Sequence, residues 1–187
     1  MPGSIFPELL GRRKRERGDT ELNRYMGRYL MGNEKEVQKA KETIKRVQYL
    51  TLATSGRNAV PWCNPLFCAY DKDYTFYWIS SRHCVHSANI KENSDVTFVI
   101  YDSTVPEGYG FGVYIKAKAE MVNDPKEIEK GLKLLYSRKK KTVPRTELFV
   151  GDTPRKVYKA VLLASWINDI ASKEEELKNI RTEIVLR

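Results

Sequence analysis

Two prolines stand inside a run of strand-forming residues, and this combination limits most strongly what the chain can fold into. Pro61 and Pro65 lie within residues 58–70, which are otherwise rich in apolar and aromatic side chains. Proline cannot donate a backbone hydrogen bond to a neighbouring strand. The segment is therefore expected at the edge of a sheet, bulged, or broken around something that approaches its backbone.

A second strand follows a tight Asp-Lys-Asp turn and ends in a polar, basic cluster. Residues 74–79 have the clearest strand pattern in the chain, and Ser80, Ser81 and Arg82 follow directly. Residues 84–92 are then expected to form a short helix. Because free N–H groups and the positive end of the helix dipole gather at a helix N-terminus, this corner suits a phosphate.

Periodicity and capping signals predict the remaining elements. Asp124, an N-cap side chain followed by a proline, gives a clear helix start. Further helices are expected over about 34–46 and from Ser172 onwards, and further strands over about 49–54, 96–101, 111–122 and 156–167. Since most strands are joined by hairpin-length connections, the order predicts an α+β domain built on a mainly antiparallel barrel.

The chain of 187 residues has room for one well-cored domain with extensions. We expect a basic N-terminal extension over 1–32, a barrel domain over 33–168 and a C-terminal amphipathic helix over 169–187. The extension is interpreted as loosely packed chain, or alternatively as a basic arm for a phosphate-bearing partner. The net charge of +9 suits nucleic acid and phosphorylated ligands equally and does not choose between them.

Composition also indicates a compartment. No apolar run approaches the ~20 residues of a membrane span, and charged residues occupy the positions where a signal peptide needs its apolar core. Cys63, Cys68 and Cys84 show no disulfide-framework spacing, which favours reduced thiols. We therefore expect a cytoplasmic protein without membrane contact.

The spacing of the cysteine, histidine and serine residues gives little support to a metal site or to a nucleophilic catalytic motif. Cys63 and Cys68 are an odd offset apart on a predicted strand and should point to opposite faces, and no zinc-type spacing links them to His83 or His86. Walker A, dinucleotide-binding and serine-elbow motifs are absent from the sequence. We expect no metal site, and no catalytic residue can be named.

Several short runs, by their order and spacing, resemble the FMN-binding split-barrel family related to pyridoxamine 5'-phosphate oxidase. The likeness covers roughly residues 45–168 and implies a homodimer of six-stranded split barrels with flanking helices. It also implies one FMN in each of two grooves at the subunit interface. The runs that carry it are Tyr49–Thr54, Asn64–Phe67, Tyr70–Asp71, Phe76–Ser80, His86, Asn89–Ile90 and Val96–Tyr101.

The resemblance further implies which residues hold the cofactor. The backbone of the second strand is expected along the flavin ring, and a hydroxyl that closes the third strand is expected at the phosphate with a basic residue of the next helix. Ser81 and Arg82 join this set because they neighbour the hydroxyl. The last strand, around Trp166, is expected to reach the cofactor of the partner subunit. The complete expected set is Asn64, Pro65, Leu66, Phe67, Cys68, Ile79, Ser80, Ser81, Arg82, His86, Gly112 and Trp166.

The chain also departs from the oxidases it resembles. His86 stands where they carry lysine, Cys63 and Cys68 replace a basic pair, and the C-terminal basic and tryptophan motif for pyridoxal phosphate is absent. We therefore expect an FMN-dependent oxidoreductase that uses flavin N5 with a small-molecule donor and acceptor, rather than vitamin B6 oxidation. The alternatives are an F420-dependent reductase, and a non-enzymatic barrel that binds nucleic acid or haem.

Overall fold

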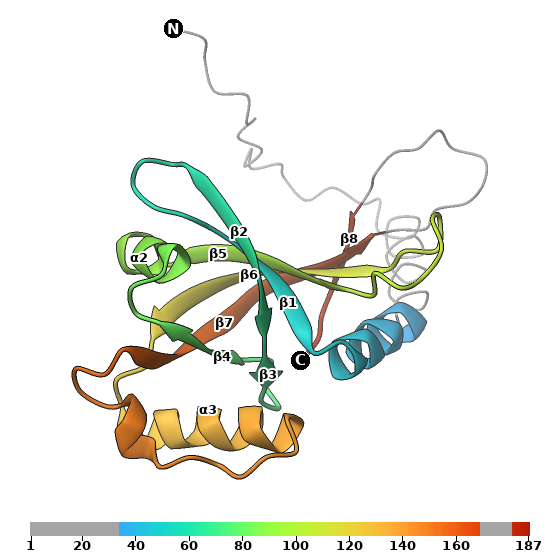
Figure 1. The fold of residues 1–187 in the computed structure, drawn as a ribbon. Coiled ribbons are helices and arrows are strands. Elements are labelled where there is room, and N and C mark those ends of the chain that lie inside the picture. Colours follow the sequence, from blue (N-terminus) through green and yellow to red (C-terminus); the bar gives the residue numbers. More distant parts are fainter. Residues whose placement is uncertain (1–33, 169–180) are drawn as a thin grey trace, which may run out of the picture. The chain divides into compact units, whose positions relative to one another are not determined.

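The computed structural model describes residues 34–168 and 181–187, whose strands form one curled antiparallel sheet (Figure 1). A helix over residues 34–46 comes first. The following elements are β1 (Tyr49–Ser55), β2 (Pro61–Phe67), β3 (Ala69–Tyr70), β4 (Phe76–Ser81), α2 (Val85–Glu92), β5 (Asp95–Tyr101), β6 (Gly112–Met121), α3 (Pro125–Arg138), the 3-10 helix η1 (Thr146–Phe149), β7 (Arg155–Asn168) and β8 (Arg181–Ile184).

The strand order is β2-β1-β5-β6-β7-β4-β3, and β8 pairs with β7. Strand β7 has β6 along one edge, while its other edge is shared by β4 near its start and β8 near its end. The prediction of a mainly antiparallel split barrel with flanking helices is confirmed. The described sheet has eight strands rather than six, because β3 is a separate two-residue strand and β8 was expected to be helical.

Strand β2 lies at the edge of the sheet and ends where the chain bends into β3, as its prolines predicted. It pairs with β1 over its whole length, from Pro61 opposite Ser55 to Phe67 opposite Tyr49. Cys68 separates the two strands, is fully buried, and donates its N–H to the carbonyl of Gln48. The bend carries the chain from the β1 side of the sheet to the β4 side.

The inner face of the curled sheet holds the main core. Alternate residues of β1, β5 and β6 point inward, which follows from the two-residue period of a strand. Trp78 stacks on Tyr158, with ring centroids 5.7 Å apart, and the helix over 34–46 adds Ala40 and Ile44 to the same core. The predicted helix at this position is confirmed.

Helix α3 packs on the outer face, over β4, β3 and the start of β7 (Figure 1). Asp124 caps it by accepting from the N–H of Glu127, as its sequence predicted. Gly131 makes the close approach possible, because a Cβ there would lie 2.9 Å from the Tyr77 ring and 3.0 Å from Val157. The Tyr77 hydroxyl donates to Glu127 at 2.5 Å, so this ring is held at both ends.

We predict that Gly131→Ala destabilises the protein. An alanine in mid-helix usually gains about 1 kcal/mol over glycine, but overpacking against the fixed Tyr77 ring costs about 1–3 kcal/mol. The melting temperature should therefore fall by a few degrees. Ser137→Ala, on an exposed position of the same helix, is the control and should leave it unchanged or slightly higher. An equal rise in both variants would contradict the close packing.

The end of α3 forms a Schellman motif with a lysine at its left-handed position. The N–H of Lys141 donates to the carbonyl of Tyr136 and that of Lys140 to Ser137, both at 3.0 Å. Lys140 has φ of 53°, a conformation that glycine adopts without strain. Arg138, in the last turn, donates to the carbonyls of Ile44, Lys45 and Val47 and so ties α3 to the helix over 34–46.

We predict that Lys140→Gly stabilises the protein by about 1 kcal/mol, because it removes the Cβ from a left-handed position. Thermal or urea unfolding measures the change. Lys140→Ala keeps the Cβ and removes the same charge, so it should show no such gain. If alanine stabilised as much as glycine, relief of charge repulsion rather than backbone strain would be the cause.

The C-terminal residues correct one prediction. Residues 181–184, expected in an amphipathic helix with the rest of 169–187, form strand β8, and Ile184 and Leu186 are buried in the core. Ser172 and the expected helix start lie outside the described residues, as does the extension over 1–32. Within the described part of the chain, no helix is both long and apolar enough to cross a membrane.

Candidate flavin-type site on the outer face of the sheet

A pocket of about 240 Å³ lies on the outer face of the sheet, beyond the area that α3 covers. Its floor is a row of side chains that stand opposite one another across the strands: Thr51 pairs with Val99, Val99 with Tyr114, and Tyr114 with Trp166. The full lining is Thr51, Ala53, Cys63, Thr97, Phe98, Val99, Tyr114, Ile115, Trp166 and Arg181.

Aromatic and cationic groups lie side by side in the pocket. Tyr114 and Trp166 supply aromatic surface, and the Arg181 guanidinium lies 4.0 Å from the centre of the Tyr114 ring. Gly112 is part of the same face, since a Cβ there would lie 3.3 Å from both the Tyr114 ring and Val99. Any larger residue at Gly112 would therefore crowd the side chains that form the floor.

The expected residues of β2 divide between the two faces of the sheet. Pro65 and Phe67 lie opposite Thr51 and Tyr49 on the outer face, as the register shows. Asn64 and Leu66 point the other way, and Leu66 packs against the core. Cys63 is exposed and lines the pocket whereas Cys68 is buried, so the predicted opposite orientation of these two thiols is confirmed.

Asn64 carries a buried polar atom without a partner. Its Oδ1 has no hydrogen bond in the described structure, although buried amide oxygens are almost always paired. Leaving such an atom unpaired costs roughly 1–3 kcal/mol. Asn64 lies opposite the buried Leu52, so this atom does not face the pocket on the outer side of the sheet.

We call the end of β4 and the start of α2, with Ser80, Ser81, Arg82 and His86, the corner. The hydroxyl and the imidazole expected at the phosphate contact each other there. Ser80 Oγ lies 2.8 Å from His86 Nε2, and the two residues are only 9% and 6% exposed. The Cys84 thiol, at the start of α2, is 3.2 Å from the same nitrogen. Burial lowers the pKa of His86, so the imidazole is neutral at pH 7.

A second hydroxyl and two cations lie near this pair, and each has its own partner. Arg82 is exposed and forms an ion pair with Asp152, while Ser81 Oγ accepts from the N–H of His83. Lys156 stands opposite Ser80 in the sheet, is 3% exposed, and donates to the carbonyls of Phe149 and Gly151. Ile79 packs beneath α3 and does not reach the corner.

The structure therefore brings some expected site residues together and separates others. Gly112 and Trp166 share the pocket face with Pro65, and Ser80 contacts His86 at the corner. Tyr114 and Arg181 were not predicted from the sequence. The two-residue period of β6 could have placed Tyr114 beside Gly112, but Arg181 was assigned to a helix. No group of three or more metal-binding side chains occurs in the described part of the chain.

The strand order and the placement of the helices define a split β-barrel. The sequence profile described as pyridoxamine 5'-phosphate oxidase matches residues 37–162, and the chain belongs to this family. A search of curated proteins finds no match.

Solved structures share the fold at low sequence identity. A candidate 5-nitroimidazole antibiotic resistance protein from Bacteroides thetaiotaomicron is 15% identical, with a TM-score of 0.57 over 70% of this chain and 81% of that one. An F420 reductase is 19% identical (TM-score 0.50; 67% and 94%). A heme-binding protein from Mycobacterium smegmatis is 13% identical (TM-score 0.58; 70% and 52%). At this identity the likeness shows the fold alone.

We predict that acidification destabilises the protein through His86. Its pKa is lowered in the folded state, so the unfolded chain takes up a proton first as the pH falls below the usual value of about 6.5. Stability present above that pH should be lost progressively as the pH falls below about 6.5, above the range in which ordinary carboxylates titrate. Urea unfolding at several pH values measures it. His86→Asn should flatten this dependence, and the exposed His83→Asn should leave it as in the parent.

Proposed function

We propose that this protein is an FMN-dependent oxidoreductase that works as a homodimer and binds the flavin on the outer face of the sheet. The observation that carries the proposal is the aromatic pocket formed by Tyr114 and Trp166 across four paired strands. Family membership adds weight, because the matched region contains all of β1 to β6.

The described residues fit a flat cofactor in one respect. The lack of a side chain at Gly112 lets the Tyr114 ring and Val99 pack closely in the floor of the pocket, since a Cβ there would lie 3.3 Å from both. A glycine in a strand weakens that strand, so this arrangement costs stability in a chain without a ligand. Asn64 points to the opposite face of the sheet, and its unpaired Oδ1 does not serve the pocket.

The exposed residues of the corner are the ones best able to bind the phosphate. Ser81 and Arg82 can offer a hydroxyl and a guanidinium without breaking the core, although Arg82 must leave Asp152. Ser80 and His86 satisfy each other, so either must rotate away from its partner to meet a phosphate. We therefore assign the first contact to Arg82 and Ser81, and a supporting role to the neutral His86. Because Ser81 pairs with the start of β7 and Trp166 lies near its end, the corner of one copy and the aromatic pocket of the other hold the same flavin in this proposal.

A second copy of the chain completes the site in this proposal. The pocket of about 240 Å³ is smaller than the roughly 300–1,000 Å³ of typical small-molecule sites. The same face exposes the large side chain of Tyr101, which is 47% exposed and lies opposite Gly112. An apolar face of this kind is suited to a partner subunit.

FMN supplies hydride and electron transfer at N5 when bound. The chain's own residues then bind and orient the flavin and its reactants. Trp166 and Tyr114 offer aromatic surface to a flat ring, and Arg181 places a positive charge beside Tyr114. Neither a carboxylate nor an imidazole lines the pocket among the described residues, so proton transfer falls to the reactants or to water. The three free thiols agree with a reducing, cytoplasmic location.

We predict that the full-length protein is purified yellow and releases FMN on heating. Trp166→Ala should lower the bound flavin at least tenfold, which corresponds to the loss of about 1.4 kcal/mol of stacking and apolar contact. Leu163→Ala, an exposed apolar residue of the same strand, should retain it. Absorbance of the protein peak and gel-filtration mass give bound flavin and subunit number together.

Other outcomes separate the alternatives. A protein that takes up neither FMN nor F420 but shows a haem absorbance band belongs to the haem-binding branch of the fold. A colourless protein that binds DNA with a steep salt dependence is a nucleic-acid module. Unchanged flavin retention in an Arg82→Ala, His86→Ala double variant would show that the phosphate lies elsewhere.

A further inference from the structure

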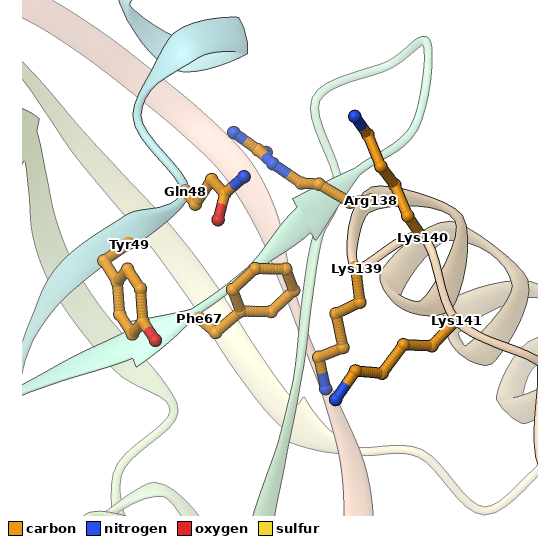
Figure 2. A pocket seen from close by; sticks show the side chains of 7 residues that line it. All are labelled: Gln48, Tyr49, Phe67, Arg138, Lys139, Lys140 and Lys141. Carbon is orange, nitrogen blue, oxygen red and sulfur yellow. The ribbon is translucent and has the colours of Figure 1, made fainter.

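A second pocket, of about 570 Å³, lies at the C-terminal end of α3 and is strongly basic (Figure 2). Its wall is formed by four consecutive cationic residues and two aromatic rings. The lining is Gln48, Tyr49, Phe67, Arg138, Lys139, Lys140 and Lys141. We call it the basic pocket. The flavin proposal does not use it, and its volume is within the usual range for small-molecule sites.

The cations of the basic pocket differ in their contacts. Arg138 donates to three main-chain carbonyls and is therefore part of the scaffold. In Figure 2 the side chains of Lys139 and Lys141 converge, so that their ammonium groups lie side by side. Consistent with this view, the charges of Arg155 and Lys141 add to burial in lowering the pKa of Lys139.

Among residues 34–168 and 181–187, no acidic side chain pairs with these ammonium groups. The described residues contain eight ion pairs, and none of them includes Lys139, Lys140 or Lys141. Like charges held together without a counter-ion are unfavourable. Such an arrangement favours a bound anion that carries more than one negative charge.

Backbone strain at Lys140 is a second feature of the basic pocket. Its left-handed conformation, with φ of 53°, is one where glycine would remove roughly 1 kcal/mol of strain. A lysine at this position adds a further positive charge to the lining of the pocket. Strained positions of this kind concentrate at ligand-binding sites.

The aromatic side of the pocket offers a stacking surface. Tyr49 is 56% exposed, and its ring packs edge-on against Phe67, with centroids 5.7 Å apart and planes at 83°. Lys139 Nζ lies 5.0 Å from the centre of the Phe67 ring, which covers that ring. Tyr49 is thus the ring available to a flat ligand, beside the two adjacent ammonium groups.

We propose that the basic pocket binds a nucleoside diphosphate group, with the base on Tyr49 and the phosphates on Lys139 and Lys141. Lysine ammonium groups bind phosphate oxygens as compact charges, and exposed tyrosines accept stacked bases. The group is either a free nucleotide or half of a dinucleotide. The pocket continues the outer face used in the flavin proposal, because Tyr49 and Phe67 are the strand pair next to Thr51 and Pro65 on that face.

The test measures ADP, pyrophosphate and adenosine binding to the full-length protein by calorimetry at about 0.15 M salt. ADP should bind saturably and more tightly than either fragment. A Lys139→Gln, Lys141→Gln double variant should weaken ADP binding about tenfold or more. A Lys91→Gln, Lys126→Gln double variant, which removes two exposed lysines outside the basic pocket, is the charge-matched control and should not change it. No saturable ADP binding, or an equal loss in the control, would overturn the proposal.

A second variant tests the nucleoside part. Tyr49→Leu should weaken ADP binding several-fold through the lost stacking and leave pyrophosphate binding unchanged. If ADP and pyrophosphate bind alike and Tyr49→Leu has no effect, the assignment to a nucleotide is wrong. Competition by NADPH would identify the group as part of a dinucleotide. Lack of competition would identify it as a free nucleotide. Both results agree with a nucleotide site in the basic pocket.

Flavin retention, measured on the same samples, separates this inference from the flavin proposal. The lysine double variant should keep its FMN, and Trp166→Ala should lose FMN while it still binds ADP. Release of FMN by ADP would show that the basic pocket is part of the flavin site and would overturn its assignment as a separate one. Melting temperatures of all variants show that the fold is intact.

Discussion

The break between β2 and β3 is the constraint on which the rest of the structure depends. Pro61 and Pro65 are four residues apart, so their ring nitrogens face the same edge of β2, and the free edge is the one that tolerates two missing N–H groups. The chain can leave the sheet at Cys68 and join β4 through Ala69 and Tyr70. The sheet thereby curls around its core without a continuous ladder, and its outer face stays accessible beside the edge.

Local signals predicted most of this architecture. Asp124 accepts from the N–H three residues later, as an N-cap should, and the alternation of β5 and β6 separates buried from outward side chains. The C-terminus shows where such signals fail. Thr182, Ile184 and Leu186 follow a two-residue period that matches β8, yet a run this short fits a helical period as well. Pairing with β7 decides between them, and pairing is not written in the local sequence.

The candidate site was less predictable because it depends on which strands become neighbours. Trp166 and Gly112 were expected, but Tyr114 joins them only because β6 pairs with both β5 and β7. At the corner, Ser80 and His86 were expected as ligand residues, and their contact with each other was not expected. A polar residue near the end of a strand is either a ligand contact or a buried pair, and its burial follows from the packing of α2.

The distribution of countercharge distinguishes the two basic regions. At the corner, Arg82 pairs with Asp152, and Lys156 is surrounded by carbonyls, so a phosphate there must displace existing partners. At the end of α3, Lys139 and Lys141 are close together with no described carboxylate beside them, and an anion would bind there without breaking an ion pair. Because breaking an ion pair or a hydrogen bond weakens anion binding, the basic pocket should take a doubly charged group more readily than the corner. The positive charge of the chain then matters as local fields rather than as a total.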